Sequence, residues 1–113
     1  MHELALMEEV HRIALAAAAA QGARRIHAVK LSVGRLSGVD PEALAFAFEV
    51  VMAGGLSAGA QLELEVVPTV CRCAACDGNF KPVDVIYACP DCGCLSAEVL
   101  AGRELELTGL EVS

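Results

Sequence analysis

Cys71-Arg-Cys-Ala-Ala-Cys76 and Cys89-Pro-Asp-Cys-Gly-Cys94 contain all six cysteines of this 113-residue chain. Each segment includes a pair of cysteines with two residues between them. Such a pair can place both sulfurs on one metal ion when the backbone turns tightly, and Pro90 and Gly93 favour that turn. Two pairs supply four thiolates, the ligand set of a structural zinc ion held about 2.3 Å from each sulfur. The predicted zinc ligands are Cys73, Cys76, Cys89 and Cys92.

Cys71 and Cys94 stand outside these pairs, each two positions from a predicted ligand. Two interpretations remain open for them. They are either ordinary reduced thiols, buried or partly exposed, or alternative ligands that allow the zinc site to rearrange. In both cases four thiolates leave no open coordination position for a water molecule, so we expect no hydrolytic zinc catalysis and no enzyme.

The composition restricts the class of protein. Hydrophobic residues make up 56% of the chain, which is enough for a packed core, and the formal charge is −7. Without a basic run, the sequence argues against a nucleic-acid surface. No apolar segment is long enough to span a membrane. Glu3, Glu8 and Glu9 precede the apolar run 13–20 in place of a basic n-region, so a signal peptide is not expected. We therefore expect a cytoplasmic protein, in which cysteines bind metal rather than form disulfides.

The N-terminal part of the chain alternates between helical and extended patterns. Apolar residues recur at helical spacing over residues 3–21 and then alternate with polar ones over residues 25–34. Asp40-Pro41-Glu42 is a strong helix start, because Asp can cap, Pro fits the first turn and Glu favours the positive end of the helix. The helix that follows carries two apolar sides, one with Phe46 and Val50, and we expect both sides to be buried.

Two strands flank the cysteine segments. Residues 61–67 alternate strictly, and residues 103–112 alternate with a change of phase at Gly109 that predicts a β-bulge. The flanking strands resemble a hairpin whose loop has grown into a subdomain. We predict an α+β fold in which two helices cover one face of a three-stranded sheet and the other face is wet. The predicted domains are residues 1–69 with 98–113, and an inserted zinc ribbon at residues 70–97.

Met1-His2-Glu3 offers an α-amine, an imidazole and a carboxylate within three residues. Nitrogen-rich, square-planar coordination of this kind suits Ni²⁺ or Cu²⁺. Glu3 and Asp40 could add carboxylates if the loop before the second helix lies near the terminus. Taken alone the terminus is also compatible with an idle, solvated end. His11 and His27 are expected in surface or core-edge roles.

These motifs together resemble the HypA/HybF family of nickel metallochaperones, which act in the maturation of [NiFe]-hydrogenase. The resemblance rests on Met1-His2-Glu3, on the segment Val33-Gly-Arg-Leu-Ser37 that leads to Asp40, on Phe46-Ala-Phe48 and on the late cysteine pairs. It covers essentially the whole chain. Cys94 departs from the family, in which a residue other than cysteine is common after the second pair.

The resemblance implies a division of labour between two metals. Nickel is cargo, bound at the N-terminus through the Met1 amine and His2, with Glu3 and Asp40 as supporting or partner-contacting residues. Zinc is structural. The implied partners are a HypB-type nickel GTPase and the hydrogenase large subunit, and some members also serve urease. The protein is expected to be a monomer or homodimer.

Two other functions remain open from the sequence. One is a zinc-ribbon nucleic-acid-binding module, which the acidic charge disfavours. The other is an adaptor that docks partners through its ribbon and would bind no nickel through His2.

Overall fold

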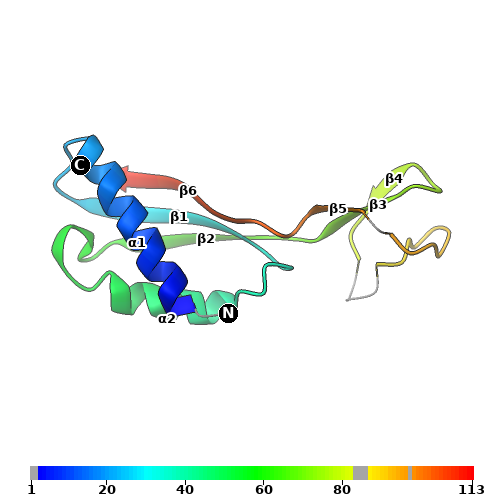
Figure 1. Ribbon diagram of the computed structural model, residues 1–113, viewed down its shortest axis with the longest axis horizontal. Coiled ribbons are helices and arrows are strands. Elements are labelled where there is room, and N and C mark those ends of the chain that lie inside the picture. The colour runs from blue at the N-terminus through cyan, green and yellow to red at the C-terminus, as the bar shows by residue number, and fades with distance from the viewer. Residues whose placement is uncertain (1–2, 83–86, 97) are drawn as a thin grey trace.

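The computed structural model describes residues 3–82, 87–96 and 98–113. The molecule is elongated, with extents of 54 × 25 × 16 Å. Two helices and a three-stranded sheet occupy one end, and a smaller sheet that carries the cysteines occupies the other (Figure 1). The elements are α1 (Glu3–Ala20), β1 (Ile26–Gly34), α2 (Pro41–Val51), a 3-10 turn (Gly55–Ser57), β2 (Gln61–Val67), β3 (Val70–Cys73), β4 (Gly78–Phe80), β5 (Glu98–Ala101) and β6 (Leu105–Val112). This arrangement confirms the predicted α+β class.

The start of α2 follows the predicted capping pattern. Oδ1 of Asp40 accepts a hydrogen bond from the Glu42 amide at 3.0 Å, and Pro41 occupies the first turn, where a missing N–H costs nothing. The first helix ends at Ala20, and Gly22 follows with a φ of 66°, a left-handed conformation that suits glycine. Among the described residues, neither helix is long and apolar enough to cross a membrane.

The main sheet has the strand order β2-β1-β6, with β1 parallel to β2 and antiparallel to β6. The expected hairpin between the two strands that flank the cysteine segments is therefore wrong for this sheet, because β1 lies between them. Burial explains the order. β1 is the most deeply buried strand, and a central position gives its backbone hydrogen-bond partners on both sides.

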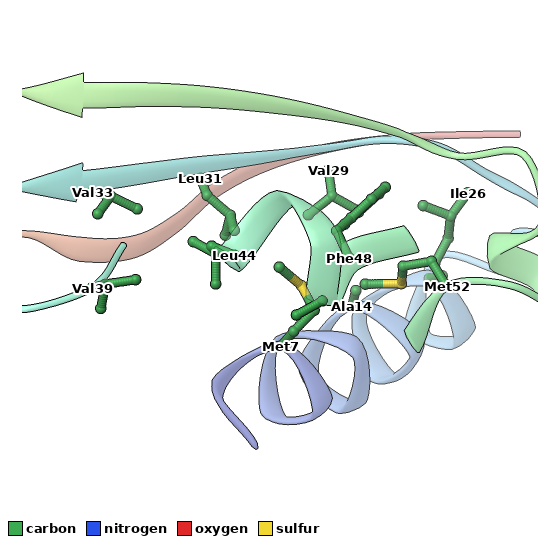
Figure 2. Close-up of a cluster of buried hydrophobic side chains, with 12 residues drawn as sticks. Met7, Ala14, Ile26, Val29, Leu31, Val33, Val39, Leu44, Phe48 and Met52 are labelled. Atoms are coloured by element: carbon green, nitrogen blue, oxygen red, sulfur yellow. The ribbon is translucent and has the colours of Figure 1, made fainter. Parts of the chain in front are cut away.

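The core lies between this sheet and the two helices. Met7 of α1 and Leu44 and Phe48 of α2 point toward Val29 and Leu31 of β1 (Figure 2). The second apolar side of α2 is not buried, in contrast to the expectation: Phe46 is 70% exposed and Val50 is 53% exposed. The physical reason is that the sheet and α1 both pack against the same side of α2, so the side with Phe46 and Val50 faces solvent.

The predicted bulge at Gly109 is confirmed. Lys30 pairs with Gly109 and the next residue, Leu31, pairs with Leu107, so Thr108 is the extra residue in β6. The Thr108 hydroxyl donates to the carbonyl of Lys30 at 3.2 Å. A Cβ at position 109 would lie 3.2 Å from Cδ of Lys30, so glycine leaves room for the lysine side chain. Lys30 in turn lies 3.4 Å from Glu111 and 3.9 Å from Glu63 on the open face of the sheet.

The small sheet has the order β4-β3-β5, and in it the continuations of β2 and β6 do pair with each other. The segment after β1 forms hydrogen bonds with both connections between the two sheets, the one from β2 to β3 and the one from β5 to β6. The Arg35 amide donates to the Val67 carbonyl at 3.0 Å and the Leu36 amide donates to the Gly102 carbonyl at 2.6 Å. A Cβ on Gly34 would lie 2.1 Å from the Gly102 oxygen, so only glycine fits this contact.

Candidate metal centres

Four sulfurs gather at the end of the molecule opposite the helices. Those of Cys73, Cys76, Cys89 and Cys92 all lie within 4.8 Å of one another. The Cys73 and Cys92 sulfurs are 3.5 Å apart, and the Cys89 and Cys76 sulfurs are 3.9 Å apart. Four sulfurs at about 2.3 Å from a tetrahedral centre lie about 3.8 Å from one another. The set therefore fits one tetrahedral metal ion, as the cysteine spacing predicts.

Local backbone geometry holds each cysteine pair in place. Cys73 ends β3, which pairs with the strand that follows the first turn. In the second pair, the Cys89 amide donates to the Cys94 carbonyl at 2.9 Å and the Gly93 amide donates to the Cys89 carbonyl at 2.8 Å. Gly93 has a φ of 76°, which glycine adopts without strain. The turn thus places the Cys89 and Cys92 sulfurs on the same side, toward the first pair.

The thiols strongly influence one another's ionisation. The protonated Cys76 thiol donates hydrogen bonds to the sulfurs of Cys92, Cys73 and Cys89, and these bonds raise its pKa to about 12. A hydrogen bond from the Cys94 backbone, with smaller contributions from the Cys76 and Cys73 thiols, lowers the pKa of Cys92. Four thiolates this close repel one another without a cation between them. The cluster is therefore built to bind a metal cation and to release protons as it does so.

The two cysteines outside the pairs have contrasting surroundings. Cys71 is completely buried and packs in the small core of the ribbon with Phe80, Tyr87 and Val99. Cys94 is exposed and stands two positions after Cys92. The cluster of four sulfurs includes neither of them.

The N-terminal candidate site is described only from Glu3 onward, so Met1 and His2 lie outside the described residues. The structure does bring the other two candidates together. The Asp40 amide donates to Oε2 of Glu3 at 3.3 Å, across 37 positions of sequence. The start of α1 and the start of α2 therefore meet, and the loop before α2 lies beside the first turn of α1.

The other two histidines make structural hydrogen bonds. Nε2 of His11 lies 3.0 Å from the hydroxyl of Ser57, a completely buried residue of the 3-10 turn. Nε2 of His27 lies 2.7 Å from the hydroxyl of Ser113. Both roles agree with the core-edge and surface positions expected from the sequence. Ser57 gave no signal in the sequence, because a single serine in a turn carries no periodicity.

Comparison with known proteins assigns this arrangement of sheets and cysteines to a family. The family model described as hydrogenase/urease nickel incorporation, metallochaperone, hypA matches residues 1–112. The chain belongs to the HypA family. A hydrogenase maturation factor HypA from Picosynechococcus is 51% identical over 112 residues, which make up 99% of both chains. Another from Roseiflexus is 43% identical over 112 residues, 98% of this chain and 91% of that protein.

Two solved HypA structures share the fold. The solution structure of the nickel metallochaperone HypA from Helicobacter pylori, 24% identical, has a TM-score of 0.66 and covers 99% of this chain and 97% of its own. A second solution structure of a HypA protein, 26% identical, has a TM-score of 0.69 with coverages of 100% and 97%. The resemblance noted from the sequence is confirmed. This HypA family member is a nickel metallochaperone of hydrogenase and urease maturation, a carrier rather than an enzyme, with a four-cysteine zinc-like site.

Proposed function

We propose that the protein binds one Ni²⁺ at its N-terminus, through the Met1 amine, His2 and Glu3, and surrenders it to an acceptor. The observation that carries this assignment is the contact between Glu3 and Asp40, which places the first turn of α1 against the loop that caps α2. The adjoining terminus has few covalent constraints, so its ligands can leave the ion one at a time. Nitrogen-rich coordination of this type suits nickel.

Asp40 has a supporting role in this proposal. Its Oδ1 already accepts the Glu42 amide, and its own amide holds the Glu3 carboxylate. Asp40 thus orients Glu3 while its side chain caps the helix. Direct ligation of nickel by Asp40 is the alternative, and the Asp40→Asn and Asp40→Ala substitutions separate it from this role.

The second ion is a structural zinc bound by Cys73, Cys76, Cys89 and Cys92. The sulfur spacing suits a tetrahedral ion, and four thiolates select zinc among the common cellular divalent metals that do not undergo redox chemistry. Because the two short cysteine segments contribute most of the small core, zinc binding there is folding free energy of the ribbon. The domain division that we propose remains residues 1–69 with 98–113, and the ribbon at 70–97.

The proposed partners are a HypB-type nickel GTPase as donor and the hydrogenase large subunit as acceptor, in the cytoplasm. Family membership supports a place in the maturation pathway. The acidic chain, with a formal charge of −7, is suited to basic partner surfaces rather than to nucleic acid.

A nickel titration followed by native mass spectrometry tests the proposal on the zinc-loaded chain. The wild type should carry one persistent zinc and one nickel, and His2→Ala should lose the nickel while it keeps the zinc. His27→Ala is the matched control, because His27 is exposed and bonded to the last residue of the chain. Nickel binding by His2→Ala as tight as in the wild type would place the cargo site elsewhere.

A further inference from the structure

The outer edge of β2 is a free strand edge. β2 is the last strand of the order β2-β1-β6, and in the described part of the chain only β1 forms a ladder with it. Its seven residues contain no proline, lysine or arginine, the residues that commonly protect an exposed edge. The backbone N–H and C=O groups of alternate residues along this edge therefore remain available to an added strand.

A groove runs along the same edge on the helix side. It has a volume of about 480 Å³ and lies between α2, which contributes Ala45, Phe48 and Glu49, and β2, which contributes Leu62 and Leu64. Its floor is apolar, since Phe48 is nearly buried and the two leucines are half-buried. An extended segment placed beside β2 would direct every second side chain into this groove.

The rim of the groove and the opposite face of the strand are acidic. Glu49 stands at the rim, and Glu63 and Glu65 project from β2 on the open face. The cation of Lys30 lies 3.9 Å from Glu63, a distance at which an exposed ion pair contributes little. A strand added to β2 would therefore place its alternate, open-face residues beside two glutamates.

The same charges disfavour a second copy of this chain as the occupant. Antiparallel pairing of two β2 strands sets Glu63 and Glu65 of one copy opposite or diagonal to those of the other. Like charges directly across a strand pair are destabilising, whereas opposite charges stabilise it. The edge is thus suited to a strand with complementary charge rather than to its own copy.

We propose that the free edge of β2 is a docking site for an extended segment of a partner polypeptide in which apolar residues alternate with lysine or arginine. The segment adds a fourth strand to the main sheet. Its apolar side chains enter the groove beside Phe48, and its basic side chains face Glu63 and Glu65. This inference goes beyond the nickel site and does not depend on it.

The direct test is a titration of the full, zinc-loaded chain with a capped peptide of the length of β2 that alternates valine with lysine. Binding should be saturable and should weaken as salt rises. The amide resonances that shift in NMR spectra should lie in residues 61–67 and at the groove side of α2. A peptide that alternates valine with glutamate is the control and should not bind.

Methylation of the peptide backbone tests strand addition itself. In a β-ladder only every second residue donates its N–H to the neighbouring strand. A peptide methylated on the amides of its valines and one methylated on those of its lysines should therefore differ, with one binding and the other not. Equal binding by the two methylated peptides would overturn the proposal. So would the loss of binding by both, if the unmethylated peptide binds only outside β2 and the groove.

Substitutions on the protein test the two contacts separately. Glu63→Lys and Glu65→Lys should each weaken binding of the valine–lysine peptide by about threefold or more, whereas Glu8→Lys on the exposed side of α1 makes the same change of net charge and should not. Ala45→Trp should fill the groove and abolish binding, and Ala16→Trp on α1 is its control. A footprint on β6, or a dimer that protects the β2 amides, would refute the assignment.

Discussion

Asp40 can act as a helix cap or as a nickel ligand, and two substitutions separate these roles. Asp40→Ala removes the acceptor of the 3.0 Å hydrogen bond from the Glu42 amide. Loss of a capping side chain costs about 1 kcal/mol, within a range of about 0.5–2. Asp40→Asn keeps an acceptor oxygen in the same place, and asparagine is as good a cap as aspartate. We therefore expect alanine to destabilise the protein by about 1 kcal/mol and asparagine by a few tenths.

The measurement is the free energy of unfolding from urea titrations of the zinc-loaded protein without nickel, supported by thermal melts. For a chain of this size, 1 kcal/mol lowers Tm by about 4 °C. Glu42→Ala is the matched control, because the bond to Asp40 uses the backbone amide of residue 42, which alanine retains. It should leave stability within about 0.5 kcal/mol of the wild type.

Nickel binding by the same variants completes the test. Asp40→Asn should retain nickel, since its backbone amide still holds Glu3. Asp40→Ala should weaken nickel binding only to the extent that the loop loosens. The reasoning fails if asparagine destabilises the fold as much as alanine does, or if it abolishes nickel binding while stability is kept. The second result would make the Asp40 carboxylate a ligand.

Three further changes have defined outcomes. Cys73→Ser should lose the metal and unfold the ribbon, because metal binding there is folding free energy. Cys94→Ser is the control and should keep one zinc by mass spectrometry. Zinc retained by Cys73→Ser, or lost by Cys94→Ser, would contradict the ligand set. Met7→Ala, at a completely buried site, should cost about 2–5 kcal/mol in urea unfolding, and a cost below about 1 kcal/mol would mean that the core is looser than its burial indicates. Gly34→Ala should cost about 3 kcal/mol or more, because its methyl would meet the Gly102 backbone, while Gly54→Ala, with open space around it, should be nearly neutral and serves as the control.

Features that depend on neighbouring residues in sequence could be predicted well. The cap at Asp40 is a contact with the residue two positions away, and the bulge at Gly109 appears as a change of phase in the alternation. The cluster of four sulfurs likewise comes from two short segments, each of which turns locally. In each case the residues that form the structural feature are the same residues that form the recognisable sequence motif.

Features that depend on how elements pack could not be predicted in the same way. The alternation in residues 61–67 fixes which face is apolar but not which strand is the neighbour, and so the central position of β1 was missed. Two apolar sides on α2 suggested burial on both, yet no element in the described part of the chain covers Phe46. The contact between Glu3 and Asp40 joins positions 37 apart and had to await the structure.

The strand order gives the ribbon a mechanical role. β2 and β6 lie on opposite sides of β1, yet their continuations β3 and β5 pair directly with each other. The part of the chain that connects β2 to β6 therefore crosses the end of β1. The distance between these two outer strands is two strand spacings, or about 10 Å. A metal ion that stabilises the ribbon also stabilises the pairing of β3 with β5. It thereby helps to hold β2 and β6 in place on either side of β1. A version of the protein without residues 70–97 would need a linker long enough to make the same crossing.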